Sequence, residues 1–458
     1  MSWLSGLISG KKRRSVSHRR EPADMTVALS RSTPRTNGSV QVSSMPKFHG
    51  TAADQLHGSR GSAIDRARFR LRSAFTPSQP VVNARMFAGR TEVLKTLIRS
   101  IEDQQLHVVL YGDRGIGKTS LLHILSQLAR EARYIVRYGS CGEETEFSDL
   151  FRSIAKDIPL LYHSDYAPTS DEIEEGRSLA DLLPAEGALN VPQVSELLSK
   201  LSGTRVLIVL DEFDRADSSA FRRSVAELIK NLSDRSVRVQ LVIAGVAANL
   251  TELIEHIPSI RRNILGLQVP SMDNTEIEDL IRNGEAVCGL TFDAEAKAFI
   301  SAVAHGSPYI ASLLSQHAGL SAVERSASLV SKGDVAAAIR QAVDEIRHRV
   351  SSKSLFHISA AIEKGYGSKL GLLARAALHS GGRLTKQQAD IVMGDDGGIA
   401  FMEMIGERFG LIRSIDHDPE NAFQFSEEGV PVYLWMRLAE DKFAGDASGM
   451  ARLDEVTG

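Results

Sequence analysis

The sequence contains few cysteines and lacks any long apolar run. Among 458 residues only Cys141 and Cys288 are cysteines, too few for a disulfide framework and without the spacing of a metal site. We therefore expect a reducing compartment, the cytoplasm. No apolar stretch approaches the ~18 residues that a membrane-spanning helix requires. The short apolar segment from Trp3 to Ile8 precedes its positive charges instead of following them, unlike a secretory signal.

The chain also has almost no net charge, −3 overall, but the charge is unevenly distributed. Residues 1–80 contain 14 Lys and Arg against four acidic residues, whereas the remainder contains 40 basic and 53 acidic residues. A basic arm thus precedes an acidic body. The length predicts two or three domains, and a hydrophobic content of 43% is sufficient for ordinary cores.

Residues 1–75 are rich in Ser, Arg, Thr and Gly and have few apolar residues. This composition predicts a disordered basic arm. The first 14 residues allow a second interpretation, weak contact with an anionic membrane through one apolar helical face followed by basic residues. A localisation signal and a solvated tail are the alternatives, and the solvated tail is favoured. The residues of that apolar face are Trp3, Leu4, Leu7 and Ile8.

From about residue 80, short strand-like runs alternate with amphipathic helical segments. Such alternation predicts a parallel sheet covered by helices on both faces, an α/β fold. An acidic segment, 165–190, interrupts the pattern and indicates a surface insertion. The predicted strands are Leu106–Leu110, Tyr134–Tyr138, Val206–Leu210, Val237–Ala244 and Ile264–Val269, and the helices between them include Leu121–Arg130, Phe147–Asp157, Val194–Leu201 and Ala220–Leu232.

After Pro270 we expect the strands to stop and a small helical domain to follow over residues 271–350. Its predicted helices are Asn274–Cys288, Asp293–His305, Pro308–Gly319 and Asp334–Val350. Residues 351–445 then show three helices and a hairpin, the order typical of a winged helix, and 446–458 form a tail. The helices are Lys369–His379, Thr385–Val392 and Ile399–Phe409, and the hairpin strands are Leu411–Ser414 and Ala422–Phe425.

The most informative motif fits G-x-x-x-x-G-K-[ST] and lies between a predicted strand and a predicted helix, the context of a phosphate-binding P-loop. Glycines allow several backbone N–H groups to face one anion, and the helix adds its positive end. Lys118 is expected to reach the β- and γ-phosphates of ATP, and Thr119 to hold Mg²⁺. The predicted loop comprises Gly112, Asp113, Arg114, Gly115, Ile116, Gly117, Lys118, Thr119 and Ser120.

A second motif places two acidic residues directly after the predicted strand at 206–210. Its run of large aliphatic residues is typical of a strand buried on both faces. Asp211 and Glu212 follow at the carboxyl end, where doubly wound sheets bind ligands. We expect Asp211 to support Mg²⁺ and Glu212 to polarise the attacking water as a general base. A solvated turn after a core strand is the disfavoured alternative.

Phosphoryl transfer also requires positive charge near the developing negative charge, and an arginine donated by a neighbouring subunit is a common source. Arg261 and Arg262 precede the last predicted strand and are candidates for this role. Surface arginines that cap the preceding helix are an equally weighted alternative. An arginine acting in trans implies a homo-oligomer.

Together these motifs resemble the AAA+ superfamily of P-loop ATPases, near the branch of origin-recognition initiators, transposition-helper ATPases and STAND ATPases. The resemblance adds the segment Phe87-Ala88-Gly89-Arg90 and the helix start Gly306-Ser307-Pro308, and covers roughly residues 80–345. It implies a three-layer core over residues 76–270 with a helical lid. It also implies that Met86, Phe87 and Arg90 lie near the adenine, and that Pro308 packs near the nucleotide.

Two departures from the family pattern favour slow, switch-like turnover. The predicted strand at 237–244 is followed by residues without hydrogen-bonding side chains, and Asn249 is the nearest polar residue. The lid start at 306–309 offers no arginine for the γ-phosphate. We therefore expect a slow Mg²⁺-dependent ATPase that acts as a conformational switch. A DNA-associated initiator or loader and an ATP-binding scaffold without turnover are the alternatives.

The charge of residues 350–445 bears on the partner of the winged helix. They contain ten Lys and Arg against thirteen acidic residues, whereas affinity for DNA comes largely from basic residues that neutralise phosphates. We therefore expect this region to dock a protein in preference to DNA, which leaves the basic arm as a non-specific nucleic-acid contact.

Overall fold

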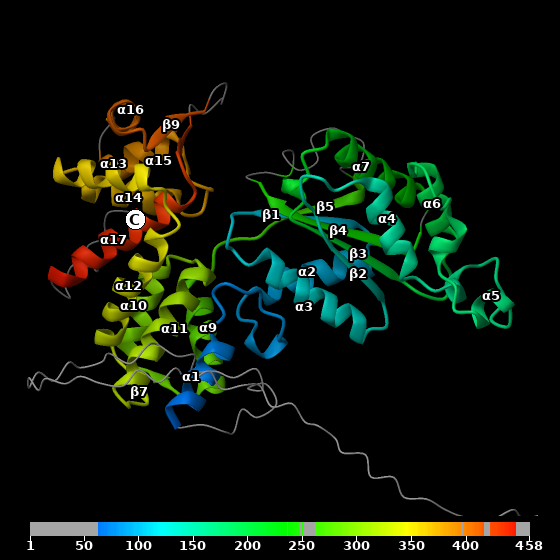
Figure 1. The fold of residues 1–458 in the computed structure, drawn as a ribbon, viewed down its shortest axis with the longest axis horizontal. Coiled ribbons are helices and arrows are strands. Elements are labelled where there is room, and N and C mark those ends of the chain that lie inside the picture. Colours follow the sequence, from blue (N-terminus) through cyan, green and yellow to red (C-terminus); the bar gives the residue numbers. More distant parts are fainter. Residues whose placement is uncertain are drawn as a thin grey trace, which may run out of the picture. The chain divides into compact units, whose positions relative to one another are not determined.

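The computed structural model describes residues 63–235, 237–247, 250, 262–394, 397–415 and 422–445. Along the chain an α/β core is followed by a helical lid and a winged-helix region (Figure 1). Among these described residues no helix is both long and apolar enough to cross a bilayer. The apolar face expected between Trp3 and Ile8 lies outside them.

The core contains one five-stranded parallel sheet with the strand order β2-β3-β4-β1-β5. All five strands were predicted from the sequence, and each end falls within two residues of the prediction. The order places β1, which leads into the P-loop, between β4 and β5. The strands are β1 His107–Gly112, β2 Ile135–Ser140, β3 Val206–Asp211, β4 Val239–Val246 and β5 Ile264–Gln268.

Helices cover both faces of the sheet, which confirms the three-layer fold (Figure 1). Because side chains alternate along a strand, β3 supplies both cores. Ile208 and Leu210 pack with α4, α6 and α7, whereas Leu207 and Val209 pack with α2 and α3. The helices are α2 Thr91–Glu102, α3 Lys118–Glu131, α4 Phe147–Lys156, α6 Val191–Ser199 and α7 Ser219–Asp234.

The acidic segment 165–190 is held to the core near its middle and near its carboxyl end. Its regular structure is limited to α5, Asp171–Glu174, and the one-turn helix Leu179–Leu182. Leu179 is fully buried and its N–H donates to Ile158 O at 2.9 Å, while Leu160 N–H donates to Arg177 O at 3.1 Å. The insertion therefore lies at the surface, and two buried leucines, Leu179 and Leu189, anchor it to the core.

The lid contains four predicted helices and one that the sequence did not predict. The predicted ones are α9 Asn274–Cys288, α10 Ala294–Ala304, α11 Pro308–Glu324 and α12 Lys332–Arg347. The expectation of disorder is wrong for the last part of the arm, because α1, Ala63–Ala74, packs against α9 and α11. It folds because Leu71 and Phe75 are buried in the lid core.

The expectation that strands stop after Pro270 is also wrong. Two short strands, β6 Thr291–Phe292 and β7 Leu329–Val330, pair in parallel inside the lid. Each contributes one buried apolar residue, Phe292 and Val330, and leaves its neighbour exposed. Two-residue strands leave no detectable alternation in a sequence, since the period of two needs several residues to become visible.

The carboxyl region has the helix and strand order of a winged helix, with a three-stranded sheet in the order β8-β10-β9. The sequence predicted α14, α15, α16 and the hairpin strands but missed α13 and β8. Its elements are α13 Ser352–Glu363, α14 Gly367–Ala377, β8 Arg383–Leu384, α15 Lys386–Met393, α16 Gly398–Phe409, β9 Ile412–Ser414, β10 Phe423–Phe425 and α17 Gly429–Gly445. The lid and winged helix share one apolar core, and Trp435 Nε1 donates to Val303 O at 2.8 Å.

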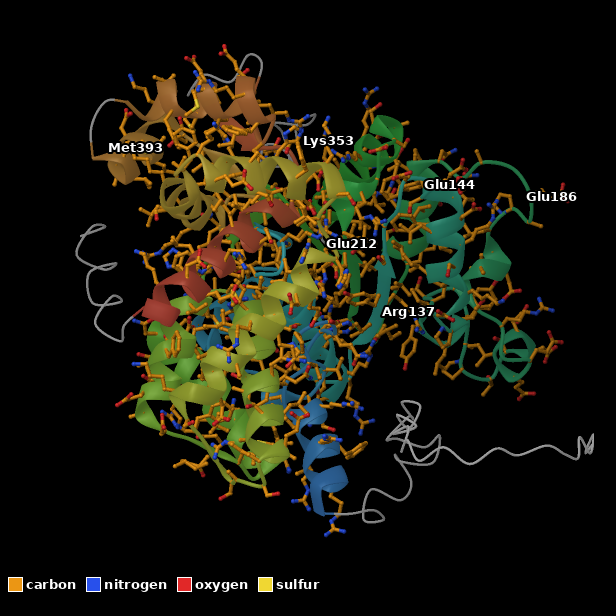
Figure 2. The ribbon with its side chains drawn as sticks, turned by 60° about the vertical axis from the view of Figure 1, so that its left-hand side comes forward. Arg137, Glu144, Glu186, Glu212, Lys353 and Met393 are labelled. Atoms are coloured by element: carbon orange, nitrogen blue, oxygen red, sulfur yellow. The ribbon has the colours of Figure 1, made fainter. Side chains whose placement is uncertain are left out.

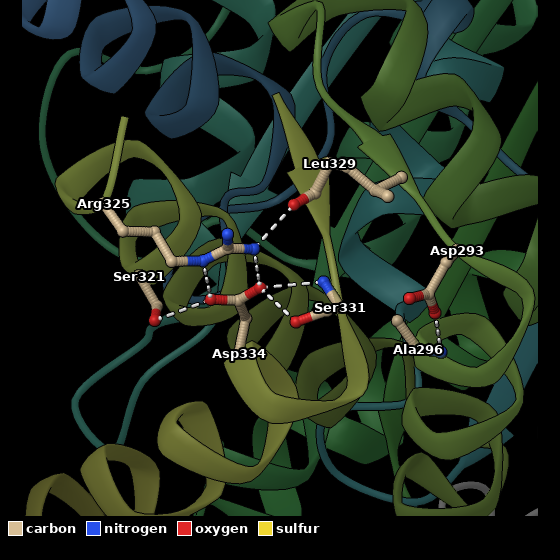
Figure 3. Close-up of polar contacts among 7 residues, drawn as sticks. All are labelled: Asp293, Ala296, Ser321, Arg325, Leu329, Ser331 and Asp334. Atoms are coloured by element: carbon tan, nitrogen blue, oxygen red, sulfur yellow. Dashed lines mark hydrogen bonds and ion pairs between the residues drawn. The ribbon is translucent and has the colours of Figure 1, made fainter. Parts of the chain in front are cut away.

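A buried carboxylate, Asp334, fixes the start of α12 (Figure 3). It accepts from Arg325 Nη2 at 2.6 Å and Nε at 2.9 Å, from Ser331 N and Oγ at 2.8 Å each, and from Ser321 Oγ at 3.0 Å. Burial alone would raise the pKa of Asp334. The donors outweigh it and hold that pKa well below its ordinary value.

We expect Asp334→Ala to lower the free energy of unfolding by about 2 kcal/mol, because the buried donors lose their acceptor. A carboxylate whose folded pKa is depressed stabilises the fold above its unfolded pKa and loses that effect as pH falls through the folded pKa. The stability difference between wild type and variant should therefore shrink below about pH 4. Urea unfolding at pH 7 and pH 3 measures this, and an unchanged difference would contradict it. The exposed Asp344→Ala serves as the control.

Candidate functional site

Most of the predicted site residues line one cleft with a volume of about 660 Å³. This volume lies within the range of pockets that hold small molecules and cofactors. The P-loop, the acidic pair after β3, the start of α11 and the segment 76–88 all contribute to its lining. Segments separated by more than two hundred residues thus form one concave surface.

The P-loop curves because two of its glycines adopt the left-handed region. Gly115 has φ +74° and Gly117 has φ +94°, a conformation that disfavours other residues. A β-carbon on Gly117 would lie 3.0 Å from Arg90 Nη1 and 3.8 Å from Pro308 Cγ. The loop passes directly into α3 at Lys118, so the positive end of that helix faces the cleft.

Lys118 is buried and held in place by the loop itself. Its Nζ donates to Gly112 O at 2.8 Å and Asp113 O at 2.7 Å. Burial lowers the pKa of Lys118 to about 8, opposed by the nearby Asp214 and Asp113 carboxylates. A curved loop with left-handed glycines and a preoriented ammonium fits a polyphosphate.

Asp211 is the buried carboxylate of the cleft, with 4% of its surface exposed. It accepts from the Tyr138 hydroxyl at 2.6 Å and from Glu212 N at 2.9 Å. Thr119 lines the same cleft. Hydroxyl and carboxylate oxygens are donors that Mg²⁺ prefers, so these two residues fit the predicted metal. When bound, Mg²⁺ neutralises phosphate charge.

Glu212 lies at the end of β3 with a strained backbone, at φ +53° (Figure 2). A non-glycine residue in the left-handed region is uncommon and is often found at functional sites. Its Oε2 accepts from Ser140 Oγ and from Arg215 Nη1, both at 3.0 Å. Its side chain is 46% exposed. Glu212 is thus oriented and reachable by water, as a general base requires.

Asp214 and Tyr138 also belong to this cleft region, although the sequence did not single them out. Asp214 lines the cleft, and its Oδ1 accepts from Val246 N at 2.8 Å where β4 ends. It therefore supplies a polar group at a strand end that has no polar side chain of its own. The spacing of Asp214 three residues after Asp211 was a usable signal. The position of Tyr138 depends on strand pairing.

At the other end of the cleft, Met86 and Phe87 line the wall where the base is expected. Arg90 also lines this wall, but its polar contacts are with α9 and with the end of the core at Pro270. Its N–H donates to Glu276 Oε1 at 2.6 Å and its Nη2 to Pro270 O at 3.0 Å. Burial lowers the pKa of Arg90 to about 10, opposed by Glu276. Arg90 therefore links the core to the lid beside the P-loop.

The lid and the winged helix both touch the P-loop. Pro308 and Tyr309 line the cleft, and Tyr309 Cβ lies 3.7 Å from the position of a β-carbon on Gly115. Arg114 Nη1 donates to Glu428 Oε2, beside the start of α17, at 2.6 Å. This ion pair is largely exposed, so it contributes little to stability, but it joins the winged helix to the phosphate loop.

The remaining predicted residues divide into three groups. Ile116 is buried in the core between α2 and α3 and the sheet, so it supports the loop from behind. Arg262 is exposed and lies outside the set that lines the cleft. Arg261 and Asn249 lie outside the described residues. The arginine acting in trans therefore stays a prediction.

Comparison with known proteins agrees with this geometry. The AAA ATPase domain family matches residues 86–243, from the wall at Met86 through most of β4. This segment is an AAA ATPase domain. The match confirms the resemblance to P-loop ATPases that the loop and the acidic pair predicted, and it covers β1, β2, β3 and most of β4. The AAA ATPase domain ends before the lid, so lid and winged helix extend beyond the matched region.

No curated protein sequence matches the chain. Among solved structures, Cdc6p from Pyrobaculum aerophilum is 15% identical with a TM-score of 0.44, covering 81% of this chain and 98% of that one. The Aeropyrum pernix Orc1 protein in complex with DNA is 16% identical with a TM-score of 0.44, covering 84% and 98%. The Holliday junction branch migration motor RuvB from Thermotoga maritima is 15% identical with a TM-score of 0.40, covering 74% and 93%.

Proposed function

We propose that this protein binds ATP with Mg²⁺ and hydrolyses it slowly as a conformational switch. The main support for this proposal is that residues of the core and the lid line the same cleft. Lys118 and Asp211 come from the core, and Pro308 and Tyr309 come from the lid. A ligand held by both parts favours one arrangement of core and lid over another.

Different residues of the cleft have different roles in the proposed hydrolysis. Lys118 and the N–H groups of the loop bind the phosphates, Thr119 and Asp211 hold the metal, and Phe87 lies against the base. Glu212 orients a water and takes up its proton. Ser140 and Arg215 both donate to the same oxygen of Glu212, Oε2, and hold the carboxylate in one orientation.

The switch is proposed to act through the contacts of the phosphate loop. The Arg114 guanidinium pairs with a single exposed carboxylate, Glu428. A triphosphate in the cleft offers it a more highly charged partner, so nucleotide binding competes with the winged-helix contact. The released surface is proposed to support self-assembly, with Arg261 or Arg262 acting in trans, or the docking of a protein partner in the cytoplasm.

Calorimetry tests the binding and mass measurement tests the switch. We expect heat on titration with MgATP, and a change of particle mass with a non-hydrolysable ATP analogue. The Glu428→Lys variant should bind ATP and reach the assembled mass at lower analogue concentration, because the contact that competes for Arg114 is replaced by repulsion. Absence of any heat with the wild type would contradict the proposed site.

The two alternatives predict different measurements. An ATP-binding scaffold should show equal, near-zero phosphate release from wild type and Glu212→Gln. An initiator or loader that grips DNA through the winged helix should show salt-sensitive duplex binding that depends on α16. The acidic balance of residues 350–445 disfavours that mode of binding.

A further inference from the structure

Asp211, the predicted metal residue, has a hydrogen-bond donor on each of its two carboxylate oxygens. Its Oδ2 accepts from the Tyr138 hydroxyl at 2.6 Å, and its Oδ1 accepts from Glu212 N at 2.9 Å. Because only 4% of the surface of Asp211 is exposed, bulk water is a poor substitute for these donors. The protein itself therefore fixes this carboxylate in one orientation.

The Tyr138 hydroxyl reaches Asp211 from a neighbouring strand. Strand β2 pairs in parallel with β3, and Ser140 lies opposite Asp211 in the register. Since side chains alternate along a strand, Tyr138 and Ser140 share one face of β2. Tyr138 is outside the set of residues that line the cleft. It therefore contacts the predicted metal residue without being part of the surface that a ligand touches.

The ring of Tyr138 is held in turn by His123 of α3. The two rings are stacked, with their centroids 4.8 Å apart and their planes 6° from parallel. Helix α3 packs against both β2 and β3 (Figure 1). His123 follows Thr119 by four residues in this helix, and residues four apart lie on the same helix face. One face of α3 thus carries Thr119 and the ring that holds the partner of Asp211.

This arrangement suits one kind of divalent cation better than another. Mg²⁺ demands nearly ideal octahedral geometry, keeps several waters and is usually bound by one or two carboxylates. Ca²⁺ takes about six to eight oxygens in flexible geometry and often accepts both oxygens of one carboxylate. Because the Tyr138 hydroxyl engages Oδ2 of Asp211, contact through both oxygens would disrupt that hydrogen bond. The fixed carboxylate therefore favours Mg²⁺.

We propose that Tyr138, held by His123, is a positioning residue whose hydroxyl fixes Asp211 so that the site takes nucleotide with Mg²⁺ in preference to Ca²⁺. This role rests on the proposed function, because it needs a site that binds ATP together with a metal. A purely structural role, in which the hydroxyl only satisfies a buried carboxylate, predicts lower stability and an unchanged preference between the two metals.

Calorimetry of the full chain with ATP tests this role under three conditions: saturating Mg²⁺, saturating Ca²⁺, and the chelator EDTA. The affinity with a metal divided by the affinity in EDTA gives the contribution of that metal. Tyr138→Phe removes the hydroxyl and keeps the ring that stacks on His123. Losing such a partner of a metal ligand typically weakens metal binding by about 10- to 100-fold, and we expect the Mg²⁺ contribution to fall by that factor.

The other two conditions separate positioning from a general loss of binding. Affinity in EDTA should stay at the wild-type value, because Lys118 and the N–H groups of the loop are unchanged. The Ca²⁺ contribution should fall less than the Mg²⁺ contribution, since the freed Oδ2 of Asp211 becomes available to a cation that accepts both oxygens. The ratio of Mg²⁺ to Ca²⁺ contributions should therefore drop, which a loss of stability alone does not produce.

The matched control is Tyr134→Phe, directly before β2. The Tyr134 hydroxyl accepts from Arg205 Nη1 at 2.9 Å, and its side chain packs against the same apolar cluster as Tyr138. This variant removes a tyrosine hydroxyl from the same layer and should keep the wild-type ratio of the two metals. Thermal unfolding of both variants in EDTA checks that each is folded without metal.

Two substitutions of His123 test the stacked pair. His123→Phe keeps a ring that can stack on Tyr138 and should preserve the metal ratio. His123→Ala removes the stack and should lower the ratio in the same direction as Tyr138→Phe. A wild-type ratio in His123→Ala would overturn the role of His123 alone.

Three results would overturn the role of Tyr138. The first is a wild-type ratio of Mg²⁺ to Ca²⁺ contributions in Tyr138→Phe. The second is an equal loss of affinity under all three conditions, which would show that Tyr138 supports the phosphate loop and not the metal site. The third is an equal change of the ratio in Tyr134→Phe. If the wild type bound no ATP under any condition, the proposed nucleotide site would fail, and this role would fail with it.

Discussion

Replacing Glu212 with Gln should leave MgATP binding intact and reduce phosphate release by at least about 100-fold, the contribution typical of a general base. Gln keeps the shape of the side chain and can still contact Ser140, which donates to the Glu212 carboxylate at 3.0 Å. It cannot accept the proton of the attacking water. Calorimetry should therefore show that this variant still binds MgATP, while a phosphate-release assay should show that it no longer hydrolyses ATP at the wild-type rate.

A matched control for this variant is Glu227→Gln, an exposed position on α7 outside the cleft. It removes the same charge and should hydrolyse ATP at the wild-type rate. If Glu212→Gln turned over as fast as the wild type, Glu212 could not be the base, and Asp214, which also lines the cleft, would be the next carboxylate to substitute. The analogous Asp214→Asn variant then decides between them.

The sequence predicted the core well because local patterns and core packing agree there. The strand β3 reads as five consecutive aliphatic residues, Val206–Leu210, and all five are buried. The P-loop was predictable because its glycines, lysine and threonine occupy fixed spacings imposed by a single anion. In both cases a few adjacent residues contain the whole physical reason for the structure.

The features that the sequence missed depend on residues far apart in the chain. Helix α1 looked like part of a disordered arm because its composition is basic, and its stability comes from Gly284 and Gly319, more than two hundred residues away. Similarly, Arg90 lines the same cleft as Phe87, but the sequence did not indicate that it also contacts Glu276 and Pro270. Glycine positions that receive a large side chain leave no periodic signal in a sequence.

The candidate site also depends on contacts between strands that are far apart in the sequence. Tyr138 donates to Asp211 because β2 and β3 are neighbours, with Ser140 paired to Asp211 in register. That register cannot be read from either strand alone, since each has only six residues and fits several pairings. The sequence could therefore name candidates for phosphate and metal binding, but it could not indicate the residues that orient them, such as Tyr138.

The largest effect is expected from Lys118→Ala, which should abolish detectable ATP binding. The ammonium is buried at 7% exposure and is held by Gly112 O and Asp113 O at the centre of the P-loop. Its removal takes away a charge-assisted contact worth about 1.5–3 kcal/mol, roughly a 10- to 150-fold loss in affinity. It also leaves three nearby carboxylates without the ammonium that faces them, which adds repulsion towards the phosphates: Asp113, Asp211 and Asp214.

Calorimetry with MgATP measures this loss, and thermal unfolding checks that the variant is folded. The loop carbonyls Gly112 O and Asp113 O lose a donor in Lys118→Ala, so a modest drop in melting temperature is expected and does not by itself explain lost binding. Lys230→Ala, an exposed lysine on α7, is the control for charge and should bind as the wild type does. A folded Lys118→Ala protein that still held ATP would show that the phosphates lie elsewhere, because no other lysine among the residues that the structure describes lines this cleft.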